Sequence, residues 1–279
     1  MAAHLPRRAL LGTGAALAAA PARAQPWRPA RSVTILVPFG AGSGTDAISR
    51  ILAGLLEPIW GQPVVIENRA GANGALAAGA TARSAPDGLT LMMTTNTPSA
   101  ANPALMKKLD YDPVDDFSAI CRTGNYNFWL AVPAASPFRT VAELLAAAKA
   151  KPGQLTYASG NSTGIVAGGA IAAQAGVEMT HVPYRSTPPA ITDLIAGRVT
   201  CMVVDASSSL GQVKGGQMRV LGVTTKQRSK LLPDVPALSE VGLPGFDGFS
   251  STPEEFGGFI KDEIVKWGRM ARTAGIEPE

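Results

Sequence analysis

The chain has few of the side chains that usually hold metal ions or act as nucleophiles and bases. Its 279 residues include two cysteines and two histidines, and no Cys-x-x-Cys pair occurs. Since His4 lies close to the N-terminus, His181 is the one histidine of the main body. The spacings of structural zinc sites are therefore missing, and we expect neither a metal site nor another cofactor. Cys121 and Cys201 lie far apart in β-like runs, and we expect two buried free thiols instead of a disulfide.

Charged side chains are also sparse, at 16% of the residues. No basic stripe with interleaved aromatic residues is present, and such a stripe is the usual sign of a nucleic-acid-binding face. The formal net charge of +4 depends largely on Arg7, Arg8 and Arg23 near the N-terminus. We therefore expect no nucleic acid among the partners.

Long hydrophobic runs are missing as well. An Ala/Leu-rich run over residues 9–20 follows Arg7 and Arg8, and Ala22-Arg23-Ala24 supplies a small-x-small cleavage site. This order is typical of a secretory signal peptide, and the run is too short to span a bilayer as a helix. We expect residues 1–24 to be removed and the mature chain to reach the periplasm. The arginine pair also fits the twin-arginine route, and no cysteine follows the run to accept a lipid anchor.

The body of the chain alternates between strand-like and helix-like segments. Such alternation is typical of an α/β fold with mostly parallel sheets covered by helices. The expected strands are residues 33–37, 64–66, 89–93, 155–158, 179–182, 199–204 and 220–223, and the expected helices are residues 47–56, 75–82, 140–150, 165–175 and 190–196.

Two of these strands end in a similar loop. Val37 is followed by Gly40-Ala41-Gly42-Ser43-Gly44-Thr45 and a helix, and Ala158 is followed by Ser159-Gly160-Asn161-Ser162-Thr163-Gly164 and another helix. The N–H groups at a helix start lack intrahelical acceptors and favour an anion, while small residues let a ligand approach the backbone. One such unit in each half predicts two lobes that hold an anion between them.

Other interpretations of these loops fit less well. The spacing Gly40-x-Gly42-x-Gly44 departs from the dinucleotide fingerprint, although Glu67 ends the next strand, and no Walker A loop is present. Gly160-Asn161-Ser162-Thr163-Gly164 matches the Gly-x-Ser-x-Gly of a serine hydrolase. A triad with Ser162 would need His181, which lies one strand later, and we expect that histidine to be a strand residue with a bonded ring.

Two acids lie at predicted helix starts, where they can cap the helix or face a ligand. Asp46 follows the first glycine loop, and Asp205 ends a strand before Ser207-Ser208-Ser209. Both alternatives stay open, because an acid at a helix start stabilises the helix dipole whatever else it does. Trp129 and Trp267 are expected in the core.

The ordered set of motifs resembles the Bug family, the receptors of tripartite tricarboxylate transporters. The resemblance runs from about residue 32 to about residue 276. It is carried by Val37-Pro38-Phe39 with the glycine loop and Thr45-Asp46, by residues 61–69, by Ala85-Pro86-Asp87-Gly88, by residues 102–105, by Tyr157-Ala158-Ser159-Gly160, by His181-Val182-Pro183-Tyr184, by residues 232–236 and by Thr252-Pro253-Glu254-Glu255-Phe256.

The resemblance implies a non-enzymatic receptor with the two-lobed, type II periplasmic-binding-protein architecture. It would capture a small carboxylate or an amino acid in the cleft between its lobes and deliver it to the membrane subunits of the transporter. The implied lobes are residues 25–125 with 242–279, and residues 126–241. The implied ligand-binding residues are Phe39, Gly40, Ala41, Gly42, Ser43, Asp46, Asn96, Ser159, Gly160, Asn161, Thr163, Tyr184, Arg185 and Asp205.

The chain departs from the family pattern at two places. The first loop is Gly40-Ala41-Gly42-Ser43-Gly44 instead of a Pro-Pro-Gly-Gly-like sequence. In addition, Ser250 runs almost directly into Thr252-Pro253, where family members carry a further strand and helix around a Pro-x-Gly-Thr-Pro motif. The C-terminal part of the first lobe is therefore expected to be shortened. Besides a working receptor, a degenerate receptor that no longer binds and a serine hydrolase remain as alternatives.

Overall fold

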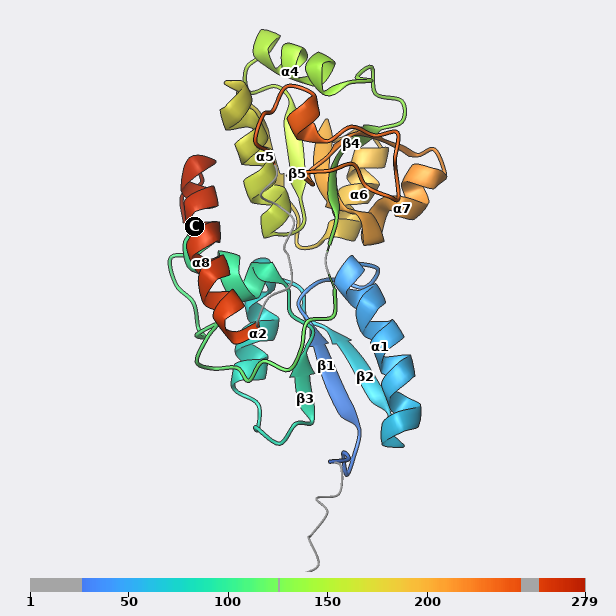
Figure 1. Cartoon of the computed structure of the whole chain (residues 1–279), viewed down its shortest axis with the longest axis vertical. Helices are drawn as coiled ribbons and strands as arrows, with labels where there is room; N and C mark the ends of the chain where they lie inside the picture. Colours follow the sequence, from blue (N-terminus) through green and yellow to red (C-terminus); the bar gives the residue numbers. More distant parts are fainter. Residues whose placement is uncertain (1–26, 125, 247–255, 279) are drawn as a thin grey trace, which may run out of the picture.

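A computed structural model of the chain describes residues 27–124, 126–246 and 256–278, and of residues 256–259 only the helical backbone. Two lobes lie one above the other along the long axis, each built around its own sheet (Figure 1). The elements in chain order are β1 (Val33–Val37), α1 (Gly44–Trp60), β2 (Val64–Asn68), η2 (Ala72–Gly74), α2 (Ala75–Ala82), β3 (Thr90–Met92), η3 (Thr97–Ala101), α3 (Asn102–Leu105), β4 (Phe128–Pro133), α4 (Val141–Ala150), β5 (Thr156–Ser159), α5 (Ser162–Ala175), β6 (Thr180–Pro183), α6 (Thr187–Ile195), β7 (Cys201–Asp205), α7 (Ala206–Lys214), β8 (Met218–Val223), η4 (Leu238–Glu240) and α8 (Phe256–Thr273).

The first lobe contains the smaller sheet, in the order β2-β1-β3, and its strand pairs are parallel. On one face of this sheet Ile35 and Val37 pack against Leu52 and Ala53 of α1. Helix α1 ends at Gly61, whose φ of 68° is the left-handed conformation that glycine adopts without strain. The carboxyl end of β1 and the start of α1 thus point toward the second lobe (Figure 1).

The second lobe contains a sheet in the order β6-β5-β7-β4-β8. Strands β5, β6 and β7 are parallel, whereas β4 runs antiparallel to both β7 and β8. Alternate residues of β4 face opposite sides of the sheet, as the two-residue repeat of a strand requires. Leu130 and Val132 pack with α4 and α5, while Trp129 and Ala131 pack with α6. Because both faces are covered, β4 is apolar along its whole length.

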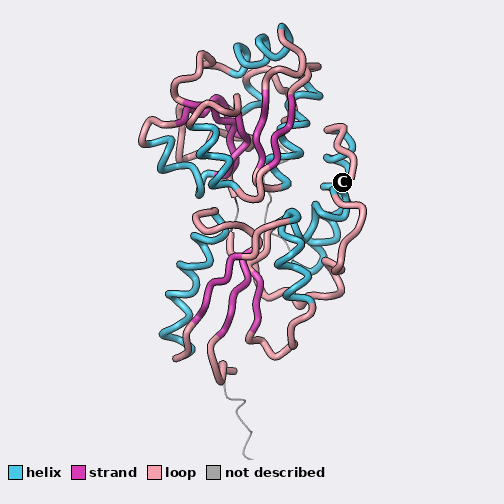
Figure 2. Tube along the Cα trace, turned by 180° about the vertical axis from the view of Figure 1, so that it is seen from behind, coloured by secondary structure: helices cyan, strands magenta, loops and turns pink. Residues whose placement is uncertain are grey.

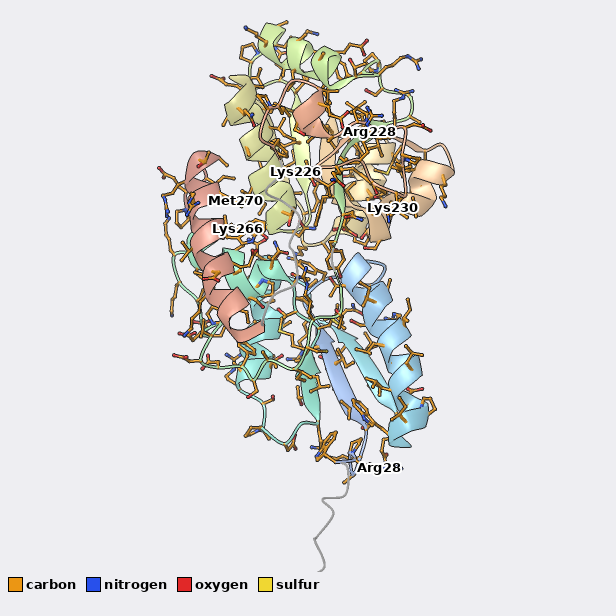
Figure 3. All side chains as sticks on the ribbon, in the orientation of Figure 1. Arg28, Lys226, Arg228, Lys230, Lys266 and Met270 are labelled. Atoms are coloured by element: carbon orange, nitrogen blue, oxygen red, sulfur yellow. The ribbon has the colours of Figure 1, made fainter. Side chains whose placement is uncertain are left out.

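The last helix contacts both lobes. Trp267 and Ala271 of α8 pack with Ala100 and Leu105 from η3 and α3, and with Val166 from α5. Figure 1 shows α8 along one flank of the molecule, Figure 2 shows the same arrangement from behind, and Figure 3 places Lys266 and Met270 on its stretch beside the second lobe. The segment just before the undescribed residues also joins the second lobe, because Leu243 and Phe246 pack in the core around β4 and α5.

The predicted strands and helices all occur, with ends shifted by a few residues. The sequence analysis omitted β4, α7 and the short helices between residues 97 and 105. Trp129 and Trp267 are buried as expected. The expectation for the cysteines was right only in part: both thiols are free and Cys201 is buried, but Cys121 is exposed and lies outside any strand. The signal peptide and the junction at Ser250–Thr252 lie outside the described residues.

Candidate functional site

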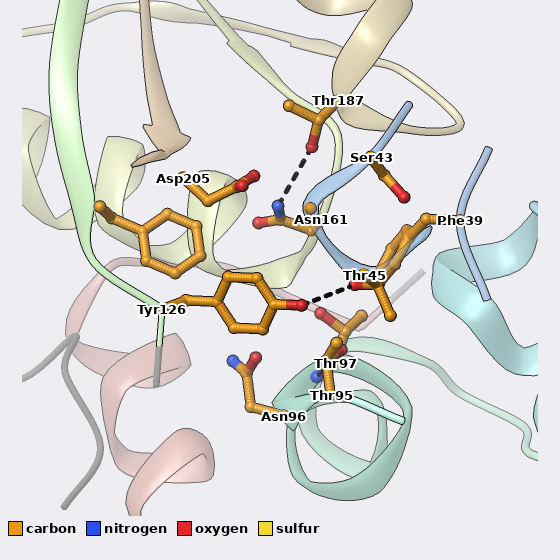
Figure 4. A pocket seen from close by; sticks show the side chains of 12 residues that line it. Phe39, Ser43, Thr45, Thr95, Asn96, Thr97, Tyr126, Asn161, Thr187 and Asp205 are labelled. Atoms are coloured by element: carbon orange, nitrogen blue, oxygen red, sulfur yellow. Dashed lines mark hydrogen bonds between the residues drawn. The ribbon is translucent and has the colours of Figure 1, made fainter. Parts of the chain in front are cut away.

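A narrow cavity lies between the two lobes, at the ends of β1 and β5 (Figure 4). Its volume is about 20 Å³, and it is partly open to solvent. That is room for about one water molecule, so the lobes stand close together. Its lining consists of Phe39, Ser43, Gly44, Thr45, Thr95, Asn96, Thr97, Tyr126, Phe128, Asn161, Thr187 and Asp205.

Helices α1, α5, α6 and α7 all begin at this cavity. Ser43, Asn161 and Asp205 are the residues that precede α1, α5 and α7, and each side chain accepts a hydrogen bond from a backbone N–H of the first turn. Helix α6 begins at Thr187, and the side chain of Ser186 before it makes no such bond. The first N–H groups of a helix have no intrahelical acceptor and carry partial positive charge, although Pro188 and Pro189 have no N–H and leave α6 with fewer such groups. The cavity is therefore suited to an anion although it is lined by neutral side chains and one acid.

Asp46 holds the first glycine loop in shape. Its carboxylate accepts hydrogen bonds from Gly42 N–H at 2.9 Å, Arg50 Nε at 3.0 Å and Asn68 Nδ2 at 2.9 Å. Burial disfavours the charged form, but the hydrogen bonds and the charge of Arg50 outweigh it and lower the pKa of Asp46 below its ordinary 3.8. Asn68 also donates to the carbonyl oxygen of Phe39 at 2.9 Å. Asp46 thus positions the loop and does not line the cavity.

The lobes are joined directly by polar contacts around the cavity. Gly44 N–H donates to Ser208 Oγ at 2.8 Å, and the Tyr126 hydroxyl donates to Thr45 Oγ1 at 3.2 Å. On the other side, the hydroxyls of Thr97 and Ser162 are 2.8 Å apart, and Asn96 Nδ2 donates to Thr163 Oγ1 at 3.2 Å. These bonds must break for the lobes to separate, so the structure has the closed arrangement.

Among the residues that the structure describes, Asp205 is the one carboxylate that lines the cavity. Its Oδ1 accepts from Ser207 Oγ at 2.6 Å, Ser208 N–H at 2.8 Å and Ser208 Oγ at 2.8 Å, while Oδ2 accepts only from Ser208 Oγ, at 3.0 Å. Burial raises the pKa of Tyr126 to about 12, and the negative charge of Asp205 acts in the same direction. Asp205 thus has two roles: its carboxylate caps α7 through Ser208 N–H, and it also lines the cavity.

Gly44 and Gly160, one from each loop, lie close to different parts of the molecule. A Cβ on Gly44 would lie 2.1 Å from Ser207 Oγ and 2.6 Å from Asp205 Oδ1, both in the other lobe. A Cβ on Gly160 would lie 2.4 Å from the backbone of Ser186 and of Thr187 within its own lobe. Gly44 thus permits close approach of the lobes, whereas Gly160 lets β5 pack against the start of α6.

The structure brings some of the predicted site residues together at the cavity. Phe39, Ser43, Asn96, Asn161 and Asp205 line it, and the hydroxyl of Thr163 is bonded to Asn96 beside it. Residues that do not line it are Gly40, Ala41, Gly42, Asp46, Ser159, Gly160, Tyr184 and Arg185. Tyr184 instead donates to Asp193 Oδ2 at 2.7 Å, and Arg185 is exposed.

Several lining residues were not singled out as site residues by the sequence analysis, namely Gly44, Thr45, Thr95, Thr97, Tyr126, Phe128 and Thr187. Gly44, Thr45 and Thr187 lie at the starts of α1 and α6, next to the residues that were named, so the same motifs could have indicated them. Thr95, Thr97, Tyr126 and Phe128 lie in segments with no motif.

His181 lies beside the hydroxyl of Ser159, and not beside Ser162, the serine that a hydrolase would use. His181 Nε2 lies 2.6 Å from Ser159 Oγ, and its ring stacks on Tyr157 with the centroids 4.9 Å apart. Ser162 is fully buried and is bonded to Thr97. The expected bonded ring of His181 is confirmed, and the hydroxyl beside it belongs to Ser159 instead of the elbow serine.

The sequence is also similar to known proteins. Residues 48–254 match the tripartite tricarboxylate transporter family receptor, TctC. The chain belongs to this family. Its resemblance to the Bug proteins is confirmed by BugT of Bordetella pertussis, which is 29% identical over 307 aligned positions covering 93% of this chain and 94% of BugT. A UPF0065 protein from the tcbD-tcbE intergenic region of a Pseudomonas species is 38% identical over 86% of this chain and 73% of its own length.

Solved TctC-type structures share the fold. R. palustris Rpa4515 with adipate has a TM-score of 0.85 and 29% identity, covering 90% of this chain and 99% of that one. MatC from Rhodopseudomonas palustris with bound malate has a TM-score of 0.80 and 25% identity, covering 87% of this chain and 99% of MatC. The predicted α/β periplasmic-binding-protein fold is thereby confirmed. The chain is a TctC-family solute-binding receptor, and its neighbours are binding proteins instead of enzymes.

The alignment with BugT is longer than this chain. It extends over 307 positions, more than the 279 residues of this chain. BugT therefore carries residues that this chain lacks.

Among the described residues, no helix combines the length and apolarity needed to cross a membrane.

Proposed function

We propose that this receptor binds a small carboxylate between its lobes, in the periplasm, and delivers it to the membrane subunits of a tripartite tricarboxylate transporter. The observation that carries the proposal is the meeting of four helix starts at one interlobe cavity. The partial positive charge at helix starts favours carboxylates without a cationic side chain. The adipate and malate complexes of two neighbours support the same class of ligand. Of the described residues, 27–124 would form the first lobe and 126–246 the second, since Leu243 and Phe246 pack in the core of the second lobe, while α8 contacts both.

Thermal-shift and calorimetric titrations test this proposal. We expect adipate, malate, a tricarboxylate such as citrate, or an amino acid to raise the melting temperature, because a ligand that binds only the folded state stabilises it. At a concentration of 100 times its Kd a ligand adds about 2.7 kcal/mol to the unfolding free energy. A cooperatively melting protein that responds to none of these compounds would contradict the proposal and favour the degenerate receptor.

A matched pair of variants on α6 locates the site. Thr187→Val removes a hydroxyl that lines the cavity at nearly constant volume, and Thr192→Val makes the same change at an exposed position of the same helix. Loss of one hydrogen bond worth about 1 kcal/mol weakens binding by roughly threefold to tenfold. We expect that loss for Thr187→Val only. Equal affinities for the two variants would place the ligand elsewhere.

A further inference from the structure

The interlobe cavity described above is too small to hold a whole organic acid. Its volume of about 20 Å³ accommodates about one water molecule. The lobes are nevertheless closed around it, since Gly44 N–H donates to Ser208 Oγ and the Tyr126 hydroxyl donates to Thr45 Oγ1. A carboxylate held by the closed lobes therefore needs further space beside this cavity for the rest of its molecule.

A second and larger cavity adjoins the first at Tyr126. Its volume is about 230 Å³, and it is partly open to solvent. Tyr126 lines both cavities, with its hydroxyl directed at Thr45 in the first (Figure 4). The second cavity also lies between the lobes, because Ile48 of α1 lines one side of it and Leu210 of α7 another. The two cavities thus form neighbouring parts of one interlobe space.

The second cavity has an apolar lining. Ile48, Leu210 and Leu231 contribute alkyl side chains to it, and none of the described residues that line it carries a charge. A cavity of about 150 Å³ lined by Leu, Ile and Phe is large enough to bind benzene, so this one has room for a phenyl ring or a short alkyl chain. Apolar groups gain free energy by entering such a space, whereas a carboxylate would lose hydration there without finding a partner.

We propose that the ligand is a monocarboxylate with an apolar body, an aryl- or alkylcarboxylate, whose carboxylate lies in the first cavity and whose body lies in the second. This inference rests on the proposed function and narrows its ligand class. The ring of Tyr126 turns aside to join the two spaces, and the bond that it gives up is a neutral one to Thr45, at 3.2 Å. The preferred ligand thus differs in class from the adipate and malate held by the two neighbours.

Two series of compounds test the proposal by calorimetry on the full chain. The first series is butanoate, pentanoate, hexanoate and 3-phenylpropanoate, and the second is succinate, glutarate and adipate, which match the first three in length. We expect affinity in the first series to rise by up to about fourfold for each added methylene group, since each is buried in the second cavity. Each dicarboxylate should bind at least about tenfold more weakly than the monocarboxylate of its length.

Leu231→Asp provides the variant for the second cavity. It places a charge in the lining at a residue that is 46% exposed, so folding should tolerate it. We expect the gain in affinity for each methylene group to fall below about twofold, because the cavity is no longer apolar. Leu76→Asp makes the same change at a residue of α2 that is 57% exposed and lines neither cavity, and the gain should stay as in the wild type.

The outcomes separate this inference from the proposed function. Tighter binding of dicarboxylates by the wild-type protein would overturn the apolar-body proposal and leave the carboxylate receptor standing. Equal gains for each methylene group in Leu231→Asp and Leu76→Asp would place the body of the ligand outside the second cavity. If no compound of either series binds, and none of the thermal-shift titration does, both proposals fall. The comparison of the two series in the wild type decides the first point even if Leu231→Asp does not fold.

Discussion

At the scale of single residues, Gly44 determines how closely the lobes approach. It is the first residue of α1, where alanine is at least as favourable for the helix as glycine. Gly44→Ala should therefore leave helix α1 itself intact. Its methyl group would overlap Asp205 Oδ1, which three donors hold in place. We expect affinity for the best carboxylate or amino acid to fall at least about tenfold, measured by calorimetry.

The control for Gly44 lies on the same helix. Nothing lies within 4 Å of a Cβ built on Gly54, which is exposed. Gly54→Ala should keep the affinity and gain about 0.5–1 kcal/mol of stability from its helix position. If Gly44→Ala binds as tightly as Gly54→Ala, the closed contact between α1 and α7 is not needed for binding.

Asp46 makes a pH-dependent contribution to stability. Its pKa in the folded protein is lowered below 3.8 because hydrogen bonds and the charge of Arg50 outweigh its burial. A lowered pKa means that the stabilisation is fully present above pH 3.8 and is lost as the pH falls through the folded-state value. We expect Asp46→Asn to lose about 1.5–3 kcal/mol at pH 7, the usual range for hydrogen bonds to a charged group. Urea denaturation from pH 7 to pH 3 should show the gap to wild type narrowing below pH 4. If the difference in unfolding free energy between wild type and Asp46→Asn is the same at every pH, the loss comes from packing and not from the charge of Asp46.

At the scale of elements, the sequence predicted those whose signal is local. The similar Gly/Ser/Thr loops after residues 37 and 158 predicted the starts of α1 and α5. Small residues and a capping side chain mark a helix start whatever the helix later packs against. The antiparallel strand β4 was missed, because Phe128–Pro133 is apolar throughout and has no two-residue alternation to reveal a strand. Its partners β7 and β8 lie about 70 or more residues later, and no local pattern predicts that pairing.

Helix α8 provides a prediction at this scale. Trp267 is 4% exposed and packs with Ala100, Ala101 and Val166, so it fastens α8 to both lobes. Replacing a buried tryptophan by alanine removes these contacts and leaves a cavity. We expect Trp267→Ala to lower the unfolding free energy by about 3–5 kcal/mol, measured by urea denaturation. Val265→Ala, on the same helix but 63% exposed, should stay within about 0.5 kcal/mol of wild type. A similarly small effect of both changes would show that α8 adds little to the stability of the fold.

At the scale of the whole molecule, the cavity combines segments that are distant in sequence. Ser43, Asn161 and Asp205 could be predicted because their residue types have a local physical meaning at helix starts. Tyr126 and Thr97 could not, since they enter the lining only when the lobes close, through bonds to Thr45 and Ser162. For a related reason the sequence left the role of Asp46 open: an acid in the first turn can face a ligand or its own loop, and the positions of Arg50 and Asn68 show its contacts with the loop.

The surface of the first lobe predicts weak self-association. On α1, Ile51, Leu55 and Ile59 are 62–66% exposed at four-residue spacing and form an apolar stripe. A helix of 17 residues is about 25 Å long and about 10 Å wide, so the stripe offers on the order of 250 Å², far below the roughly 800 Å² per partner of a stable interface. We therefore expect reversible association at high concentration, seen as a sedimentation coefficient that rises with loading. Ile51→Lys with Leu55→Lys should abolish the rise and leave ligand affinity unchanged, whereas Val265→Lys, the same kind of change at an exposed residue of α8, should not. Sedimentation as a monomer at every concentration would show that the stripe is tolerated as exposed surface.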